Sequence, residues 1–138
     1  MNIDATDLIL GRMAAYAAKQ ALLGETVNIV NVEKAVVTGK NKRIIEDYKQ
    51  ERERGVPLKG PYYPRTPEMI VKRAIRGMLP HKSARGREAL KRIKCYAGIP
   101  EEFKDAKFEK VNGASTEKTH ARYITIARIS KELGGKVQ

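Results

Sequence analysis

Apolar residues recur along this chain at two spacings, one typical of amphipathic helices and one typical of buried strands. Between Leu10 and Leu23 they return every three or four positions, which predicts a helix that ends at Gly24. The stretch Thr26–Val32 is apolar almost throughout, as in a strand buried on both faces of a parallel sheet. A short strand over residues 3–6 precedes the helix. Strand, helix and strand in this order predict a βαβ unit and an α/β layer architecture.

The remaining pattern predicts a series of short elements and one long loop. In order, we expect a short apolar run over 35–38, a charged helix over 42–54, a Pro- and Gly-rich connection over 55–67, a helix over 66–79, a basic loop over 81–86, a second helix around 89–93, a strand over 94–97, an extended surface loop over 98–119, a strand over 123–126 and a short helix over 129–133. No internal repeat or low-complexity segment interrupts the chain. Its 138 residues therefore suit a single domain, residues 1–138.

The helix predicted over 66–79 has two unlike faces. Thr66 is a suitable N-cap, and Pro80 is expected to end the helix because proline lacks the N–H and its ring clashes with the preceding turn. On a helical wheel one half is apolar, whereas Lys72, Arg73 and Arg76 lie together on the other half without an acidic residue among them. The helix can therefore attach to the core on one side and present positive charge on the other.

The formal net charge of the chain is +12, and most of it comes from this region. Residues 65–94 contain ten Lys or Arg and two Asp or Glu, which is a net charge of +8. The rest of the chain contains 18 basic and 14 acidic residues, which is a net charge of only +4. Positive charge concentrated in this way indicates a polyanionic partner.

The charged helix predicted over 42–54 is interpreted differently. Its charges stand at i,i+4 spacing, for example Lys42 with Glu46 and Lys49 with Glu53, so we expect them to pair with each other. This predicts a solvated face rather than a binding surface.

Several kinds of catalytic and metal site are not expected. A dinucleotide or phosphate loop needs several glycines where the first strand meets the first helix, and only Gly11 lies there. His81 and His120 have no partner at metal-ligand spacing, and the lone Cys95 is expected to be a buried, unreactive thiol. We therefore expect no cofactor, no metal, no small-molecule substrate and no enzymatic activity.

The chain also lacks signals for export and for membrane insertion. No stretch approaches the ~20 apolar residues of a membrane-spanning helix, and the first residues do not have the pattern of a signal peptide. A single cysteine fits a reducing, intracellular setting. We expect no membrane partner.

Basic and aromatic residues around the 66–79 helix are the candidate RNA contacts. Cations on the helix and in the loop can reach several phosphates of a bent backbone, and Gly77 and Gly86 are expected to leave room for that backbone. Tyr62 and Tyr63 are candidates to stack on unpaired bases, with one ring expected inside the protein and one outside. A structured basic face with few aromatics favours recognition of RNA shape, and no tight helix-turn-helix for DNA is present. The full set is Lys40, Tyr62, Tyr63, Arg65, Lys72, Arg73, Arg76, His81, Lys82, Arg85, Arg87 and Lys91.

Several short segments of the sequence resemble one known family. They are Arg76-Gly77-Met78-Leu79-Pro80, Gly86-Arg87, Ala89-Leu90 and Ile93-Lys94-Cys95-Tyr96-Ala97-Gly98, with support from Asp4-Ala5, Leu10-Gly11-Arg12, Val30-Asn31-Val32-Glu33-Lys34 and Val37-Thr38-Gly39-Lys40. In this order they resemble the large-ribosomal-subunit protein thirteen family (universal "L-thirteen"), over residues 3–100. The segment Gly60-Pro61-Tyr62-Tyr63-Pro64 and the form GMLPHK resemble its archaeal and eukaryotic branch.

The resemblance implies a fold, a function and partners. It implies a three-layer α/β/α fold around a central, mostly parallel, four-stranded sheet. It also implies a cytoplasmic, non-enzymatic structural protein of the large ribosomal subunit that binds large-subunit rRNA, supports subunit assembly and contacts neighbouring ribosomal proteins. In this family the Arg-Gly-Met-Leu-Pro helix and loop lie against rRNA, which implies RNA contacts at Arg76, His81, Lys82, Arg85 and Arg87. An RNA-binding translational regulator outside the ribosome is the alternative.

Overall fold

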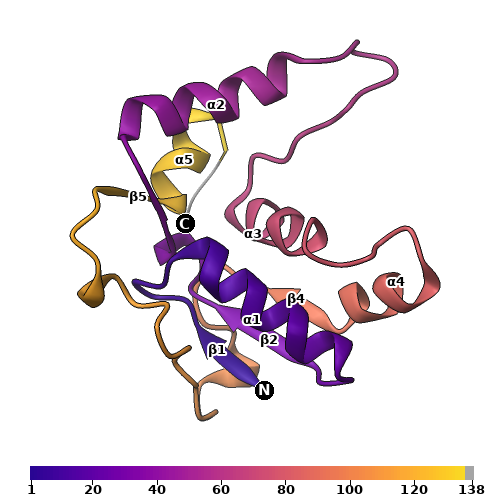
Figure 1. The fold of residues 1–138 in the computed structure, drawn as a ribbon, viewed down its shortest axis with the longest axis vertical. Helices are drawn as coiled ribbons and strands as arrows, with labels where there is room; N and C mark the ends of the chain where they lie inside the picture. Colours follow the sequence, from indigo (N-terminus) through magenta and orange to yellow (C-terminus); the bar gives the residue numbers. More distant parts are fainter. Residues whose placement is uncertain (136–138) are drawn as a thin grey trace.

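The computed structural model describes residues 1–135, in which strands and helices follow one another in the expected order. The elements shown in Figure 1 are β1 (Asn2–Asp4), α1 (Leu10–Leu22), β2 (Val27–Val30), β3 (Val36–Thr38), α2 (Asn41–Glu53), α3 (Pro67–Arg76), α4 (Ala84–Lys91), β4 (Ile93–Cys95), β5 (Tyr123–Thr125) and α5 (Ile126–Glu132). Three short 3-10 turns, Val32–Lys34, Glu101–Phe103 and Thr116–Lys118, lie between them.

The strands form one parallel sheet and one antiparallel pair. β1, β2 and β4 are parallel in the order β1-β2-β4, and Ile29 is paired with both Ile3 and Cys95. β3 pairs with β5 in the antiparallel sense, with Thr38 opposite Tyr123. The predicted α/β class, with a mostly parallel sheet flanked by helices, is confirmed. The parallel sheet has three strands rather than the expected four, because β3 and β5 pair with each other instead of extending it.

The two faces of the parallel sheet differ in polarity. The row formed by Ile3, Ile29 and Cys95 is apolar, and α1 and α3 pack against the strands that carry it. The neighbouring row on the opposite face is polar, and there the Asn28 side chain donates a hydrogen bond to Oδ1 of Asn2 at 3.1 Å. The second face of β2 is therefore mixed, because Asn28 is polar and half-buried whereas Val30, two residues on, is apolar and fully buried. β2 also ends earlier than predicted, at Val30, since the next residue adopts a left-handed conformation.

α1 supplies the centre of the core. Its inward positions include Met13, Ala14, Ala17 and Ala21, all without exposed surface, and these short alanines let the helix lie close to the sheet, α3 and α4. One hydrophobic cluster extends from Ile3 in β1 to Leu133 after α5. Within residues 1–135, no helix is both long enough and apolar enough to cross a membrane.

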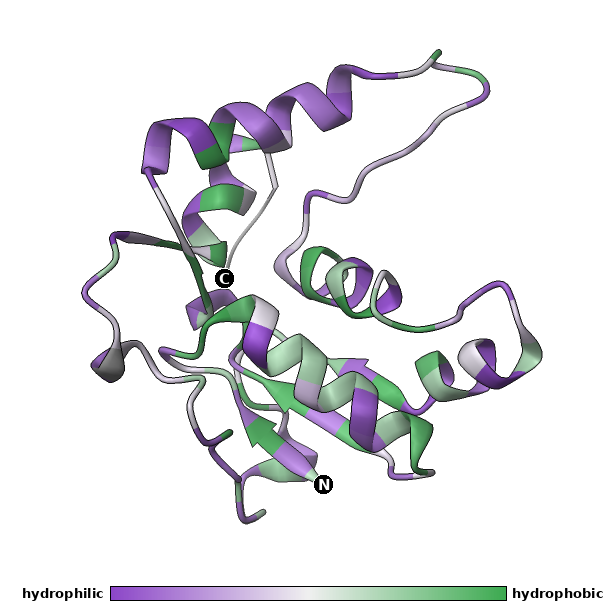
Figure 2. Cartoon of the chain, in the orientation of Figure 1, coloured by the Kyte–Doolittle hydropathy of each residue, from purple (hydrophilic) through white to green (hydrophobic). Residues whose placement is uncertain are grey.

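α2 lies at the edge of the molecule and is mostly hydrophilic (Figure 2). Only Ile44 among its residues is buried, and the helix contacts α5. The expected i,i+4 ion pairs within α2 are not formed. In the described part of the chain, the one ion pair within 4.0 Å joins Lys49 to Glu132 of α5 at 3.8 Å. Exposed pairs gain little free energy in water, so the spacing alone does not impose them.

The junction between α3 and α4 differs from the prediction. α3 ends at Arg76, and two tight turns follow, in which the N–H groups of Met78 and Leu79 donate to the carbonyls of Ile75 (2.9 Å) and Arg76 (3.1 Å). Pro80 therefore lies beyond the helix instead of ending it. α4 begins at Ala84, so Arg85 and Gly86 belong to its first turn and not to a loop.

The segment over 98–119 is irregular, as expected, but it is attached to the edge of β1. The Glu109 N–H donates to the Asn2 carbonyl at 2.8 Å, and the Ile9 N–H donates to the Ala114 carbonyl at 2.7 Å. Val111 and Ala114 are buried. The segment thus forms part of the folded body along that edge.

Candidate RNA-binding surface

α3 positions the central cations by burying its opposite side. Its residues Ile70, Val71 and Ile75 are buried, with the hydrophobic core beneath them. Lys72, Arg73 and Arg76, together with Met69, follow the i, i+3, i+4, i+7 spacing and lie on the outer side. The predicted division into an apolar face and a cationic face is confirmed.

Most of the candidate cations lie on α3, on α4 and in the turn between them. We call this group the α3–α4 surface; it comprises Lys72, Arg73, Arg76, His81, Lys82, Arg85, Arg87 and Lys91. All of them are exposed or half-exposed. None of them forms an ion pair within 4.0 Å among the residues that the structure describes. Their charge is therefore available to an external anion.

An open groove crosses this surface. We call it the Tyr62 groove, and it is lined by Tyr62, Pro64, Met69, Lys72, Arg73, Arg76 and Leu90. Tyr62 is 68% exposed and Met69 is 54% exposed, so the groove presents apolar surface beside three cations. The Tyr62 hydroxyl donates to the Pro57 carbonyl at 2.8 Å, which restrains the ring. The groove therefore offers an apolar ledge with cations around it.

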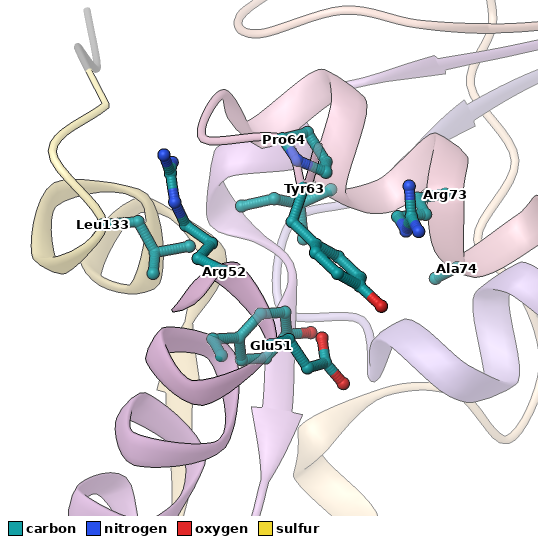
Figure 3. A pocket seen from close by; sticks show the side chains of 9 residues that line it. Glu51, Arg52, Tyr63, Pro64, Arg73, Ala74 and Leu133 are labelled. Atoms are coloured by element: carbon teal, nitrogen blue, oxygen red, sulfur yellow. The ribbon is translucent and has the colours of Figure 1, made fainter. Parts of the chain in front are cut away.

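The second tyrosine, Tyr63, is placed differently. The central carbon of the Arg73 guanidinium lies 4.2 Å from the centre of its ring, an arrangement typical of a cation–π contact. Both side chains line a pocket between α2, α3 and the end of α5, shown in Figure 3. Tyr63 is half-buried whereas Tyr62 is exposed, as expected for one ring inside and one outside. Tyr62 is thus the ring available for stacking.

Two predicted contacts lie outside the Tyr62 groove. Lys40 stands at the start of α2, and neither it nor Arg65 lines the Tyr62 groove. The backbone at Arg65 is attached to α5, where the Ser130 hydroxyl donates to the Arg65 carbonyl. The structure therefore does not bring Lys40 or Arg65 into the groove.

The predicted role of one glycine is wrong. Gly86 is buried, and a Cβ atom at this position would overlap the carbonyl group of Pro80. The missing side chain therefore permits contact between α4 and the preceding turn, not contact with RNA. Ser83 stabilises the same corner, since its hydroxyl donates to the Pro80 carbonyl at 2.8 Å and accepts from the Gly86 N–H at 3.3 Å. Gly77, in contrast, is exposed.

Comparison with known proteins identifies the family. Residues 1–102 match the family described as Ribosomal protein L13. The chain belongs to the ribosomal protein L13 family.

Archaeal relatives, each named large ribosomal subunit protein uL13, extend this match over nearly the whole chain. The protein of Methanococcoides burtonii is 48% identical over 97% of this chain and 97% of its own length. The protein of Archaeoglobus fulgidus is 48% identical over 96% of this chain and 86% of its own length, and that of Thermoplasma volcanium is 50% identical over 96% and 97%. The resemblance to the archaeal branch of the L13 family is confirmed, and it extends beyond residue 100.

L13 family proteins are structural, non-enzymatic components of the ribosome, and the sheet of this member agrees with that role. In α/β enzymes, ligands bind at the carboxyl ends of the parallel strands. Here Oδ1 of Asp4 accepts hydrogen bonds from the Thr6 N–H (3.1 Å), the Thr6 hydroxyl (2.7 Å) and the Asn31 side chain (3.1 Å). The Gly98 N–H donates to Glu33 Oε2 at 3.0 Å. The chain's own groups thus occupy this edge.

Cys95 is the single cysteine of this L13 member. Burial raises the pKa of Cys95 to about 12, so the side chain is a protonated thiol at neutral pH, as expected for an unreactive cysteine. Over residues 1–135, no group of three or more His, Cys, Asp or Glu side chains is gathered where it could hold a metal ion.

Sequence reasoning missed the apolar part of the groove. Met69 had a visible signal, because it shares the spacing of Lys72, Arg73 and Arg76 and is thus an apolar residue on a cationic stripe. The sequence contained no signal for Leu90, since this residue comes from another helix and reaches the groove only through the packing of α4.

Proposed function

We propose that this chain is a structural component of the large ribosomal subunit that binds large-subunit rRNA through the α3–α4 surface and the Tyr62 groove. The observation that carries the proposal is the group of cations from two helices, without acidic partners among the described residues, around an exposed apolar groove. Phosphates supply the missing negative charge, and unpaired bases supply flat apolar faces for Tyr62. The relatives carry the name large ribosomal subunit protein uL13, which supports the same assignment.

The rigidity of α3 explains how such a surface can organise RNA. Ile70, Val71 and Ile75 are buried in the core, so the backbone that carries Arg73 and Arg76 is held in place before RNA binds. Less conformational freedom is then lost on binding, and the phosphates are held at defined positions. In this way the protein supports assembly of the subunit in the cytoplasm, beside neighbouring ribosomal proteins.

Salt dependence tests the electrostatic part of the proposal. If roughly six to ten phosphates are contacted, affinity for a large-subunit rRNA fragment falls by about 10³–10⁵-fold between about 50 and 200 mM salt. The triple variant Arg76→Gln/Arg85→Gln/Arg87→Gln should bind more weakly and should reduce the slope of log affinity against log salt by about 2. Its thermal unfolding should stay close to that of the wild type, because all three side chains are exposed or half-exposed.

A matched control separates this surface from net charge. Lys104→Gln/Lys107→Gln/Lys110→Gln, which we call the loop control, removes the same charge from exposed positions of the 98–119 segment. The loop control should bind RNA more tightly than Arg76→Gln/Arg85→Gln/Arg87→Gln, which we call the α3–α4 variant. Equal binding by the two variants would show that only net charge matters and would contradict the proposed surface.

Fractionation of a cell lysate on a sucrose gradient tests the ribosomal role itself. A component of the large subunit co-migrates with that subunit, whereas a free translational regulator remains in the light fractions. Recovery of the protein only in light fractions would favour the regulator.

A further inference from the structure

A second group of cations surrounds an exposed tyrosine away from the α3–α4 surface. Tyr123 is 47% exposed, and it lines a shallow hollow together with Lys40, Asn41, Lys42, Ala121 and Arg122. Arg128 lines the adjoining hollow, which shares Asn41 and Lys42 with the first and also contains Lys49 and one acidic residue, Glu46. We call Lys40, Lys42, Arg122, Tyr123 and Arg128 the β5 surface.

Strand pairing brings these residues together from two distant parts of the chain. In the β3–β5 pair Thr38 is opposite Tyr123, and just beyond it the Gly39 N–H donates to the Arg122 carbonyl at 2.7 Å. With its side-chain amide oriented to suit both partners, Asn41 donates to the Tyr123 carbonyl at 3.2 Å and accepts from Arg128 Nη1 at 3.1 Å. The start of α2 is thus attached to β5 and α5, and the surface has a fixed shape.

The cations of the β5 surface form no ion pair among the described residues, and two of them lie where the helix dipole makes positive charge unfavourable. None of them is within 4.0 Å of a carboxylate in the described part of the chain. Lys40 and Lys42 flank the N-terminal end of α2, where the helix dipole is positive and the first turn contains no acidic residue. Lys40 also occupies the N-cap without a side-chain hydrogen bond, at a position where Asp, Asn, Ser or Thr is preferred. A bound polyanion would offset this repulsion.

The elements that carry the β5 surface lie apart from α4, which carries part of the α3–α4 surface. In Figure 1 β5 and the start of α2 lie at the left, whereas α4 lies at the far right. The hollow around Tyr123 and the Tyr62 groove share no residue. The two surfaces are therefore separate patches.

We propose that the β5 surface binds a second segment of the same rRNA, so that the protein bridges two RNA segments. Lys40, Lys42, Arg122 and Arg128 contact phosphates, and the Tyr123 ring stacks on an unpaired base. RNA fits better than a protein partner because Tyr123 is the one large apolar side chain lining this hollow, among three cations. The identity of the RNA rests on the proposed function, but no residue of the α3–α4 surface is used.

Hydroxyl-radical footprinting on intact large-subunit rRNA tests the bridge. The wild-type protein should protect two separate sets of nucleotides. Lys40→Gln/Lys42→Gln/Arg122→Gln should lose one set and keep the other, and its salt slope should fall by about 2. Arg76→Gln/Arg85→Gln/Arg87→Gln should show the opposite loss, and the loop control should keep both sets.

Each other outcome overturns the inference in a recognisable way. We call Lys40→Gln/Lys42→Gln/Arg122→Gln the β5 variant. If the β5 variant keeps both sets of protected nucleotides while the α3–α4 variant loses one, the proposed function stands and the second surface is refuted. If the two variants lose the same nucleotides, one RNA segment covers both surfaces and there is no bridge. If neither variant changes the footprint, the proposed function fails and the bridge fails with it.

Lys40→Asp separates binding from a structural role. Aspartate is a favourable N-cap and is attracted by the positive end of the helix dipole. In the absence of RNA, the variant should therefore unfold at a higher temperature than the wild type. The same variant should lose the β5-dependent protections. A variant that unfolds earlier, or that keeps these protections, would contradict the assignment of Lys40 to the RNA-binding surface.

Discussion

The guanidinium of Arg73 covers the ring of Tyr63, with its central carbon 4.2 Å from the ring centre. The contact joins α3 to the irregular connection that precedes it. It also lies between two cavities, since Arg73 lines both the Tyr62 groove and the pocket shown in Figure 3. A cation that is expected to contact RNA is therefore already oriented by an aromatic ring.

Arg73→Lys keeps the charge but removes the planar group that stacks on Tyr63. The contact is already present in the free protein, so its loss acts on affinity through the ordering of the side chain on binding. Ordering one long side chain costs about 0.5–1.5 kcal/mol, so affinity for rRNA should fall by about two- to ten-fold. The slope of log affinity against log salt should not change, because the number of charges is the same. Filter binding at several salt concentrations measures both quantities. Tyr63→Leu should reproduce the loss and Tyr63→Phe should not; wild-type binding by Tyr63→Leu would show that the ring has no such role.

Gly86→Ala should destabilise the protein because the added methyl group would overlap the Pro80 carbonyl where α4 meets the preceding turn. Overpacking of this kind costs about 1–3 kcal/mol. Gly11→Ala is the control, since no atom lies within 4 Å of the added Cβ and alanine is a better helix former than glycine in the first turn of α1. The urea concentration at the midpoint of unfolding, followed by circular dichroism, should therefore fall for Gly86→Ala and rise for Gly11→Ala. Unchanged stability of Gly86→Ala would contradict the close approach of α4 to Pro80.

Asp4 should make stability depend on pH. Burial favours the protonated form, but hydrogen bonds from Thr6 and Asn31 outweigh it and lower the pKa of Asp4 below its ordinary value. The stabilisation is thus complete at neutral pH and is lost as the pH falls through the folded-state pKa. Asp4→Asn should destabilise the protein by about 1 kcal/mol at pH 7, and the difference should shrink below about pH 4. Urea unfolding at pH 7 and below about pH 4 measures this difference in the free energy of unfolding. Asp105→Asn, at an exposed position, is the charge-matched control. A difference that does not depend on pH would exclude ionisation of Asp4 as the cause.

The sequence by itself determined the order of the elements, the α/β class and the two faces of α3. These properties follow from local periodicity, because burial on one side of a helix or strand requires apolar residues at its own repeat. The concentration of charge over residues 65–94 was visible for the same reason, and so were Lys72, Arg73 and Arg76 as one cationic face. Tyr62 and Tyr63 could be named as a pair, but the sequence contained no signal for which ring is exposed.

Only the tertiary structure decided how distant segments meet. α3 ends at Arg76, and the buried Gly86 lets α4 lie against Pro80, so the corner depends on packing and not on proline alone. Leu90 reaches the Tyr62 groove from a second helix, and strand pairing places Arg122 beside Lys40 and away from the other predicted contacts. A periodic pattern reports the environment of one element. The pairing of two elements depends instead on competition among all possible contacts of the chain, which is resolved only when the core closes.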